Sequence, residues 1–162
     1  MKKVLMITLI LAMIIPATLF AKGPTDLEVQ EATVAVLSVF GLVFMSSMFG
    51  QTPDGVIVDM DMETGRSVME FSDFNVDAFV ASMSEMMEQT PEEEQPVFSF
   101  NAMTGTIIVD EEGNLNLDME LSGGNVKTLE MKTSGDDMVM IEANGKDYSH
   151  LNEIFQAMEE EE

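Results

Sequence analysis

The sequence predicts an α+β fold in which an antiparallel β-sheet of about six strands, joined as hairpins in a meander, packs on a long apolar helix near the N-terminus. Two observations lead to this fold class. Residues 32–49 (ATVAVLSVFGLVFMSSMF) are eighteen residues without a charge, directly behind a helix start. Most of the chain after residue 55 alternates apolar and polar residues between turn sequences, which is the period of half-buried strands. A short middle helix and a C-terminal amphipathic helix complete the expected architecture.

The length and the N-terminal segment set the domain organisation. A chain of 162 residues favours one domain, and 46% hydrophobic residues are enough for a core. Residues 1–21 have the pattern of a secretory signal peptide, with Lys2 and Lys3 before an apolar stretch and a small residue, Ala21, at its end. An uncleaved anchor is the alternative. We therefore expect an exported protein, periplasmic or secreted, with one domain over 22–158 and an acidic tail over 159–162.

The charge is strongly negative. The chain carries 7 basic and 30 acidic residues, a formal charge of −23. Without residues 1–21 it loses two lysines and no acid, which leaves 5 basic residues against 30 acidic ones, or −25. Such a surface repels nucleic acids and anionic lipids, and it attracts basic proteins and cations. Solubility, or a salty habitat that screens the repulsion, is the alternative explanation.

The apolar segment is predicted to lie in one helix over residues 26–49. Thr25 and Glu28 have the spacing of a capping box, and Gly50 is a suitable stop. Eighteen apolar residues could span a membrane, but the flank that would then be cytoplasmic carries several acids before its first basic residue, Arg66. We therefore expect a buried helix, covered on nearly all sides by the sheet, a second helix or another subunit. Val36 and Phe40 lie near its middle and should be buried.

The strands are predicted from alternation and from turn sequences. Asn144-Gly145 is a strong tight-turn signal, and Glu63-Thr64-Gly65 is another turn. The strands that these and other turns delimit are residues 56–62, 67–74, 106–110, 114–121, 126–132 and 138–143.

Two further helices are predicted from apolar residues at helical spacing. The middle one covers residues 77–88, although a weak repeat at a spacing of 50 residues would instead make residues 76–80 a strand. The C-terminal one has Ser149 as its cap and an apolar stripe formed by Leu151, Ile154, Phe155 and Met158.

No catalytic grouping is recognisable. The chain has one histidine, His150, and no cysteine, which removes thiol chemistry, disulfides and histidine-rich metal sites. No serine lies in a nucleophile-elbow sequence, and no glycine-rich phosphate loop is present. We expect neither catalytic residues nor a cofactor, and therefore not an enzyme.

Two metal-site hypotheses deserve comparison with simpler explanations. Asp59, Asp61, Glu63 and Glu70 have the 1, 3, 5, 12 carboxylate spacing of a calcium loop, but Gly65 stands at position 7 instead of 6 and the flanks alternate like strands. Looser divalent-cation binding by acidic hairpin ends stays open.

The second hypothesis concerns copper. Met83, Met86 and Met87 lie on one helix flank, and thioether sulfur is a ligand for Cu(I). The alternative is that these methionines, among 17 in the chain, fill gaps in a core without tryptophan.

The function expected from the sequence is that of an exported, acidic, non-enzymatic binding or structural module of the bacterial cell envelope. It would act through an acidic face or through an apolar groove beside helix 26–49. A basic protein, a divalent cation and an apolar ligand are the partners that this composition allows. Nucleic acid is not expected as a partner, nor is a stable membrane span after signal cleavage. The alternative is a periplasmic metal-handling protein that binds Cu(I) through methionines or Ca2+ through acidic hairpin loops.

Overall fold

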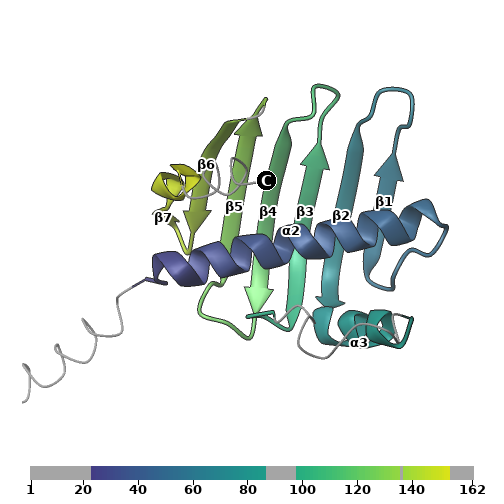
Figure 1. Cartoon of the computed structure of the whole chain (residues 1–162), viewed down its shortest axis with the longest axis horizontal. Helices are drawn as coiled ribbons and strands as arrows, with labels where there is room; N and C mark the ends of the chain where they lie inside the picture. Colours follow the sequence, from purple (N-terminus) through teal and green to yellow (C-terminus); the bar gives the residue numbers. More distant parts are fainter. Residues whose placement is uncertain (1–22, 87–97, 136, 154–162) are drawn as a thin grey trace, which may run out of the picture.

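The computed structural model describes residues 23–86, 98–135 and 137–153. These residues form one antiparallel sheet of seven strands in the order β1 to β7, with a long helix lying across one of its faces (Figure 1). The helices are α2 (Asp26–Met48) and α3 (Val76–Met86), and a 3-10 turn, η2, covers Ser149–Leu151. The strands are β1 (Val56–Met60), β2 (Ser67–Asn75), β3 (Ala102–Val109), β4 (Leu115–Ser122), β5 (Thr128–Ser134), β6 (Asp137–Ala143) and β7 (Lys146–Asp147).

The predicted fold class is confirmed, and the strand count rises from about six to seven. Every strand pairs with its neighbour in the sequence, so the sheet is a simple meander. The additional strand is β7, whose two residues are too few to show an alternation. It follows the predicted turn at Asn144-Gly145, where both residues have positive φ (51° and 75°), as the two-residue turns of tight hairpins require.

The core lies between the sheet and α2. Alternate strand residues point toward the helix and are buried, among them Met69, Phe71, Met103, Ile107, Leu117, Met119, Leu129, Met131 and Ile141. From α2, Val29, Ala32, Val36, Val39 and Val43 meet them, and all five are fully buried. These small and branched side chains let the helix lie close to the sheet, so the buried face of α2 is well matched to a broad, flat partner.

The start of α2 is fastened in several ways. The predicted capping box is present: the Glu28 N–H donates to the Thr25 hydroxyl (3.2 Å), and the Thr25 N–H donates to the Glu28 carboxylate (2.8 Å). Asn125, in the β4–β5 loop, donates to Glu28 over 2.5 Å. His150 lies 2.9 Å from the carboxylate of Asp26. These contacts connect the first turn of α2 to two segments that are distant in the sequence.

The prediction that this helix belongs to the core is confirmed for one side only. Within the described residues the sheet covers one side of this helix, and the expected cover of its other sides by another subunit stays a prediction. Leu27, Val34, Met45 and Met48 are exposed on α2, and Phe40 is half-buried, whereas Val36 is buried as expected. By length and composition α2 could also cross a membrane; 33% of its most apolar 18-residue window is buried.

Residues 76–80 are helical, which settles the alternative that the sequence left open. The side chain of Asn75 accepts a hydrogen bond from the Ala78 N–H (2.9 Å) and so caps α3, which packs at one end of the sheet (Figure 1). The predicted end of this helix beyond Met86 lies outside the described residues. So do the signal peptide over 1–21, the acidic tail and nearly all of the predicted C-terminal helix, of which η2 marks the beginning.

Candidate functional site on the open face of the sheet

The face of the sheet that points away from α2 carries a row of carboxylates. Side chains alternate between the two faces of a strand, so the neighbours of buried residues point away from the helix. The ladder register places one such residue of each strand directly opposite the next, from β2 to β7. The row reads Glu70, Thr106, Asp118, Glu130, Glu142 and Asp147.

We call these six residues the carboxylate row. In three neighbouring pairs of the row, a negative charge lies directly opposite another negative charge. They are Asp118 with Glu130, Glu130 with Glu142, and Glu142 with Asp147. Directly opposite residues on one face lie about 5 Å apart at Cβ, and like charges at that distance destabilise a sheet. Lys132 is the one cation among the strand residues described on this face, so it cannot neutralise the row. The result is a broad negative field over the open face.

The side chains of the carboxylate row form a line across the sheet and do not point toward a common centre. Neighbouring strands lie about 4.8 Å apart, so successive carboxylates form a line across the sheet. Within the described ranges, no three Asp, Glu or His side chains are grouped so that they could hold a metal ion. Asp147, at the end of the row, is also engaged locally: it accepts from the Ser149 N–H (2.8 Å), and hydrogen bonds from Ser149 lower its pKa. This arrangement suits long-range attraction of a cationic surface.

The four calcium candidates are not brought together. Asp59 lies in β1, Asp61 and Glu63 lie in the following turn, and Glu70 lies in β2, so strands and not helices flank the loop. Asp59 and Glu70 share the open face at diagonal ladder positions.

Asp61 has a different role, in the β1–β2 turn. Its carboxylate accepts from the Glu63 N–H (2.9 Å), and this backbone hydrogen bond is the main reason why the pKa of Asp61 is lowered. Asp61 therefore stabilises the hairpin turn, as aspartate does in many turns.

Of the three copper candidates, one is described in full. Met83 lies in α3, is half-buried and packs against the core. It lines an apolar pocket of about 300 Å³ together with Leu42, Met45 and Phe49. The side chain of Met86 and the whole of Met87 lie outside the described residues, so the trio cannot be compared as a set.

A groove lies beside α2, but unlike the apolar groove that the sequence suggested, it is not lined by apolar residues alone. It has a volume of about 440 Å³ and lies between the outer side of α2 and the segment before β3, with Leu27, Val34 and Phe98 among its lining residues. Glu31 and two serines also line it, so its surface is mixed. We regard it as a weaker candidate than the open face, because nothing in its lining selects one kind of ligand.

Sequence reasoning placed Glu70, Asp118, Glu130 and Glu142 in predicted strands, but it missed the two-residue strand that contains Asp147, and it missed the row. Which acids oppose each other depends on strand register, and register is set by the turns. Counting outward from the turns after β3, β4 and β6 would have given the register of those ladders. The same count from the turn after β5 would have paired Glu130 with Ile141 instead of Glu142, because the register shifts between Lys132 and Thr133.

The chain was compared with known proteins. No protein-family model matches it, and searches of curated proteins and of solved structures find no match either.

Proposed function

We propose that this protein is an exported, non-enzymatic binding module of the bacterial cell envelope, and that the open face of its sheet docks a cationic protein. The carboxylate row carries this proposal. It presents five acidic side chains in ladder positions on a rigid sheet, with one lysine beside them.

A cationic partner suits this face for an energetic reason. In the free protein the opposed carboxylates repel one another and weaken the sheet. Lysine or arginine side chains placed between them would replace repulsion by attraction. A partner that binds the folded state in this way also raises the stability of the fold. Docking and stabilisation are therefore two consequences of one arrangement of charge.

The docking test uses polylysine as the probe and measures its affinity for the purified protein at low and at physiological salt. The variant Asp118→Lys with Glu130→Lys changes the middle of the carboxylate row. The control Glu111→Lys with Glu112→Lys changes the total charge equally, but in the β3–β4 turn. We expect the row variant to bind at least about fivefold more weakly than the control, as the loss of two ion pairs worth about 0.5 kcal/mol each implies.

Equal weakening in the row variant and the turn control would contradict the proposal. It would mean that the probe responds to total charge and not to this face. Binding that survives physiological salt in the wild type and fails in the row variant would support docking at the row.

Export is tested separately. The N-terminal pattern of two lysines, an apolar stretch and Ala21 supports cleavage after residue 21. Sequencing of the protein recovered from the periplasm or medium of a producing bacterium should give Lys22 as the first residue. Full-length protein retained in the membrane fraction, starting at Met1, would refute cleavage.

A further inference from the structure

The two edges of the sheet are finished differently. At one edge, β7 pairs with only two residues of β6. The segment after β7 binds further backbone groups of β6: the Tyr148 N–H donates to the Ile141 carbonyl (2.8 Å), and the Ile141 N–H donates to the Ser149 hydroxyl (3.1 Å). At the other edge, β1 has β2 as its single neighbour among the described strands. Edge strands present unpaired backbone groups to other chains, so β1 is the place where this sheet could be extended.

Two hydrogen bonds at the ends of the β1–β2 ladder show which backbone groups of β1 are engaged. The Gly55 carbonyl accepts from the Ser72 N–H (2.8 Å), and the Asp61 N–H donates to the Arg66 carbonyl (2.9 Å). Both pairs fit the register of the ladder, which has no bulge. In an antiparallel pair the hydrogen-bonded positions recur at every second residue.

It follows that Ile57 and Asp59 direct their backbone groups toward β2, while Val58 and Met60 direct theirs outward. The N–H of Val56 is already held by the Pro53 carbonyl (3.3 Å). Within the described residues no other segment is hydrogen-bonded to the outward groups of Val58 and Met60. An added antiparallel strand would find these donors and acceptors available.

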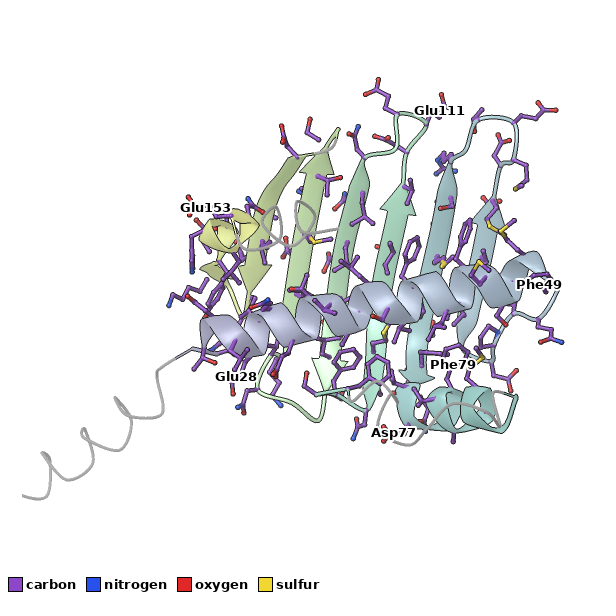
Figure 2. All side chains as sticks on the ribbon, viewed as in Figure 1. Glu28, Phe49, Asp77, Phe79, Glu111 and Glu153 are labelled. Carbon is purple, nitrogen blue, oxygen red and sulfur yellow. The ribbon has the colours of Figure 1, made fainter. Side chains whose placement is uncertain are left out.

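The end of α2 provides an apolar surface beside this edge. The helix continues past β1, and Phe49 lies at its far end (Figures 1 and 2). Phe49 is 78% exposed and Met45 is 54% exposed, and together with Leu42 and Met83 they line the apolar pocket of about 300 Å³. Side chains of an added strand that point to the helix side would meet this surface.

The charge around β1 selects the kind of strand that can be added. Asp59 is exposed on the open face of β1, and Asp54 and Asp61 lie beyond its two ends. A second copy of the chain would bring the same acids to the same edge, and a charge of −23 with them. A segment with a lysine or arginine opposite Asp59 would meet complementary charge.

We propose that β1 accepts an extended segment of a partner protein as an eighth strand. The segment has apolar side chains at alternate positions, facing the end of α2, and a cationic side chain opposite Asp59. Main-chain hydrogen bonds to Val58 and Met60 supply much of the binding, as in other cases of strand addition. This site goes beyond the proposed docking at the carboxylate row and does not depend on it.

The test uses an end-capped peptide of alternating valine and lysine, with the purified full-length protein. Residue-resolved amide exchange should show that the peptide protects the N–H groups of Val58 and Met60, while those of Ile57 and Asp59 are protected already. The matched control is the same peptide with N-methyl groups on alternate amides. This control peptide keeps the charges and side chains but loses backbone N–H donors, and it should bind at least about tenfold more weakly.

A protein variant gives an independent measurement. Val58→Pro removes an outward N–H without breaking a bond to β2, a position where edge strands tolerate proline. It should weaken the peptide at least about tenfold, whereas Val58→Ala should retain most of the affinity. If Val58→Pro does not fold, the N-methylated peptide still decides the question.

The outcomes separate this site from the carboxylate row. Peptide binding that persists in high salt and in the Asp118→Lys, Glu130→Lys variant supports strand addition, because its main-chain and apolar contacts are little screened. Equal affinity of the N-methylated peptide, or no protection at Val58 and Met60, would overturn the inference. Sedimentation that shows a wild-type dimer and a monomeric Val58→Pro variant would assign the edge to a second copy and would overturn it as well.

Discussion

Gly105 in β3 lies where the backbone of β4 leaves no room for a side chain. Its φ is +147°, and a Cβ atom built on it would lie 2.1 Å from the carbonyl oxygen of Asp118. Gly113 also has a positive φ, +86°, but no atom lies within 4 Å of its Cβ position. We expect Gly105→Ala to lower the free energy of unfolding by about 2–4 kcal/mol through strain and overlap. Gly113→Ala should lower it by about 1–2 kcal/mol through conformation alone.

Denaturant unfolding of the two glycine variants measures this difference. Similar losses in both variants would mean that β3 and β4 can separate slightly at Gly105, and that close approach is not the constraint there.

Asp110 should make the stability of the fold depend on pH. Its carboxylate accepts from the side chain (2.9 Å) and the N–H (2.8 Å) of Asn114, and these hydrogen bonds keep its pKa below the usual 3.8. A carboxylate whose pKa is lowered in the folded state stabilises the fold above the unfolded pKa, and this contribution disappears as the pH falls through the folded pKa. Asp110→Asn should therefore melt at a lower temperature than the wild type at neutral pH, and the difference should shrink below about pH 4.

Thermal melts between neutral and acidic pH check this prediction. Glu111→Gln is the matched control, because the side chain of Glu111 makes no hydrogen bond in the described part of the chain, and it should show no such convergence. A constant difference between wild type and Asp110→Asn at all pH values would show that shape and not charge matters at this turn.

At the scale of the element, the same Val→Asp substitution can be compared on the buried face and on the exposed face of α2. Val39 is fully buried against the sheet, whereas Val34, one and a half turns earlier, is 43% exposed on the outer face. Val39→Asp buries an unpaired charge and should remove several kcal/mol, enough to unfold a domain of ordinary stability. Val34→Asp should change stability by less than about 0.5 kcal/mol.

Circular dichroism melts of the two aspartate variants decide between a helix docked on the sheet and one held elsewhere. If both variants fold equally well, the contact between α2 and the sheet is not required for folding. If both fail, the outer face of α2 is also covered in solution.

The sequence predicted the helices and strands best where the determining residues are local. The capping box at Thr25 and the stop at Gly50 place α2 within one residue of its observed end. The alternation of Leu115 to Leu121 likewise gives β4. The one-sided burial of α2 could not be predicted, because a helix that is apolar on every side does not show which side meets the sheet.

At the scale of the whole molecule, the carboxylate row should make stability depend on salt. Glu130 opposes acids on both of its neighbouring strands. Glu130→Gln should raise the free energy of unfolding by about 0.5 kcal/mol at low salt, because it removes two like-charge pairs. The gain should fall as salt is added and the repulsion is screened.

Urea unfolding at two salt concentrations measures this effect, with Glu63→Gln in the exposed β1–β2 turn as the control for total charge. An equal gain in the control would attribute the effect to the charge of the chain as a whole and would remove the row as its cause.

The candidate site was predicted less completely than the fold. The excess of acid was visible in the composition, and so was the idea of an acidic face. The row itself needs six strands in register, and the free edge at β1 needs knowledge of which strand is outermost. Both are properties of the assembled sheet, to which residues from Ile57 to Asp147 contribute.

The meander also determines the sequence separation of the residues that must meet during folding. Every strand pairs with its neighbour in the sequence, and each pair except β2–β3, which α3 and the segment after it separate, closes over a short loop. Short loops favour rapid folding. Two contacts between the start of α2 and the segment after β7 join residues that are much farther apart in the sequence. The Tyr148 hydroxyl donates to the Pro24 carbonyl, and His150 contacts Asp26, with a separation of 124 residues in each case. These contacts have the longest loop to close, so we expect them to form last. The sheet can therefore assemble hairpin by hairpin, and the first turn of α2 is fixed in place only when residues 148–150 reach it.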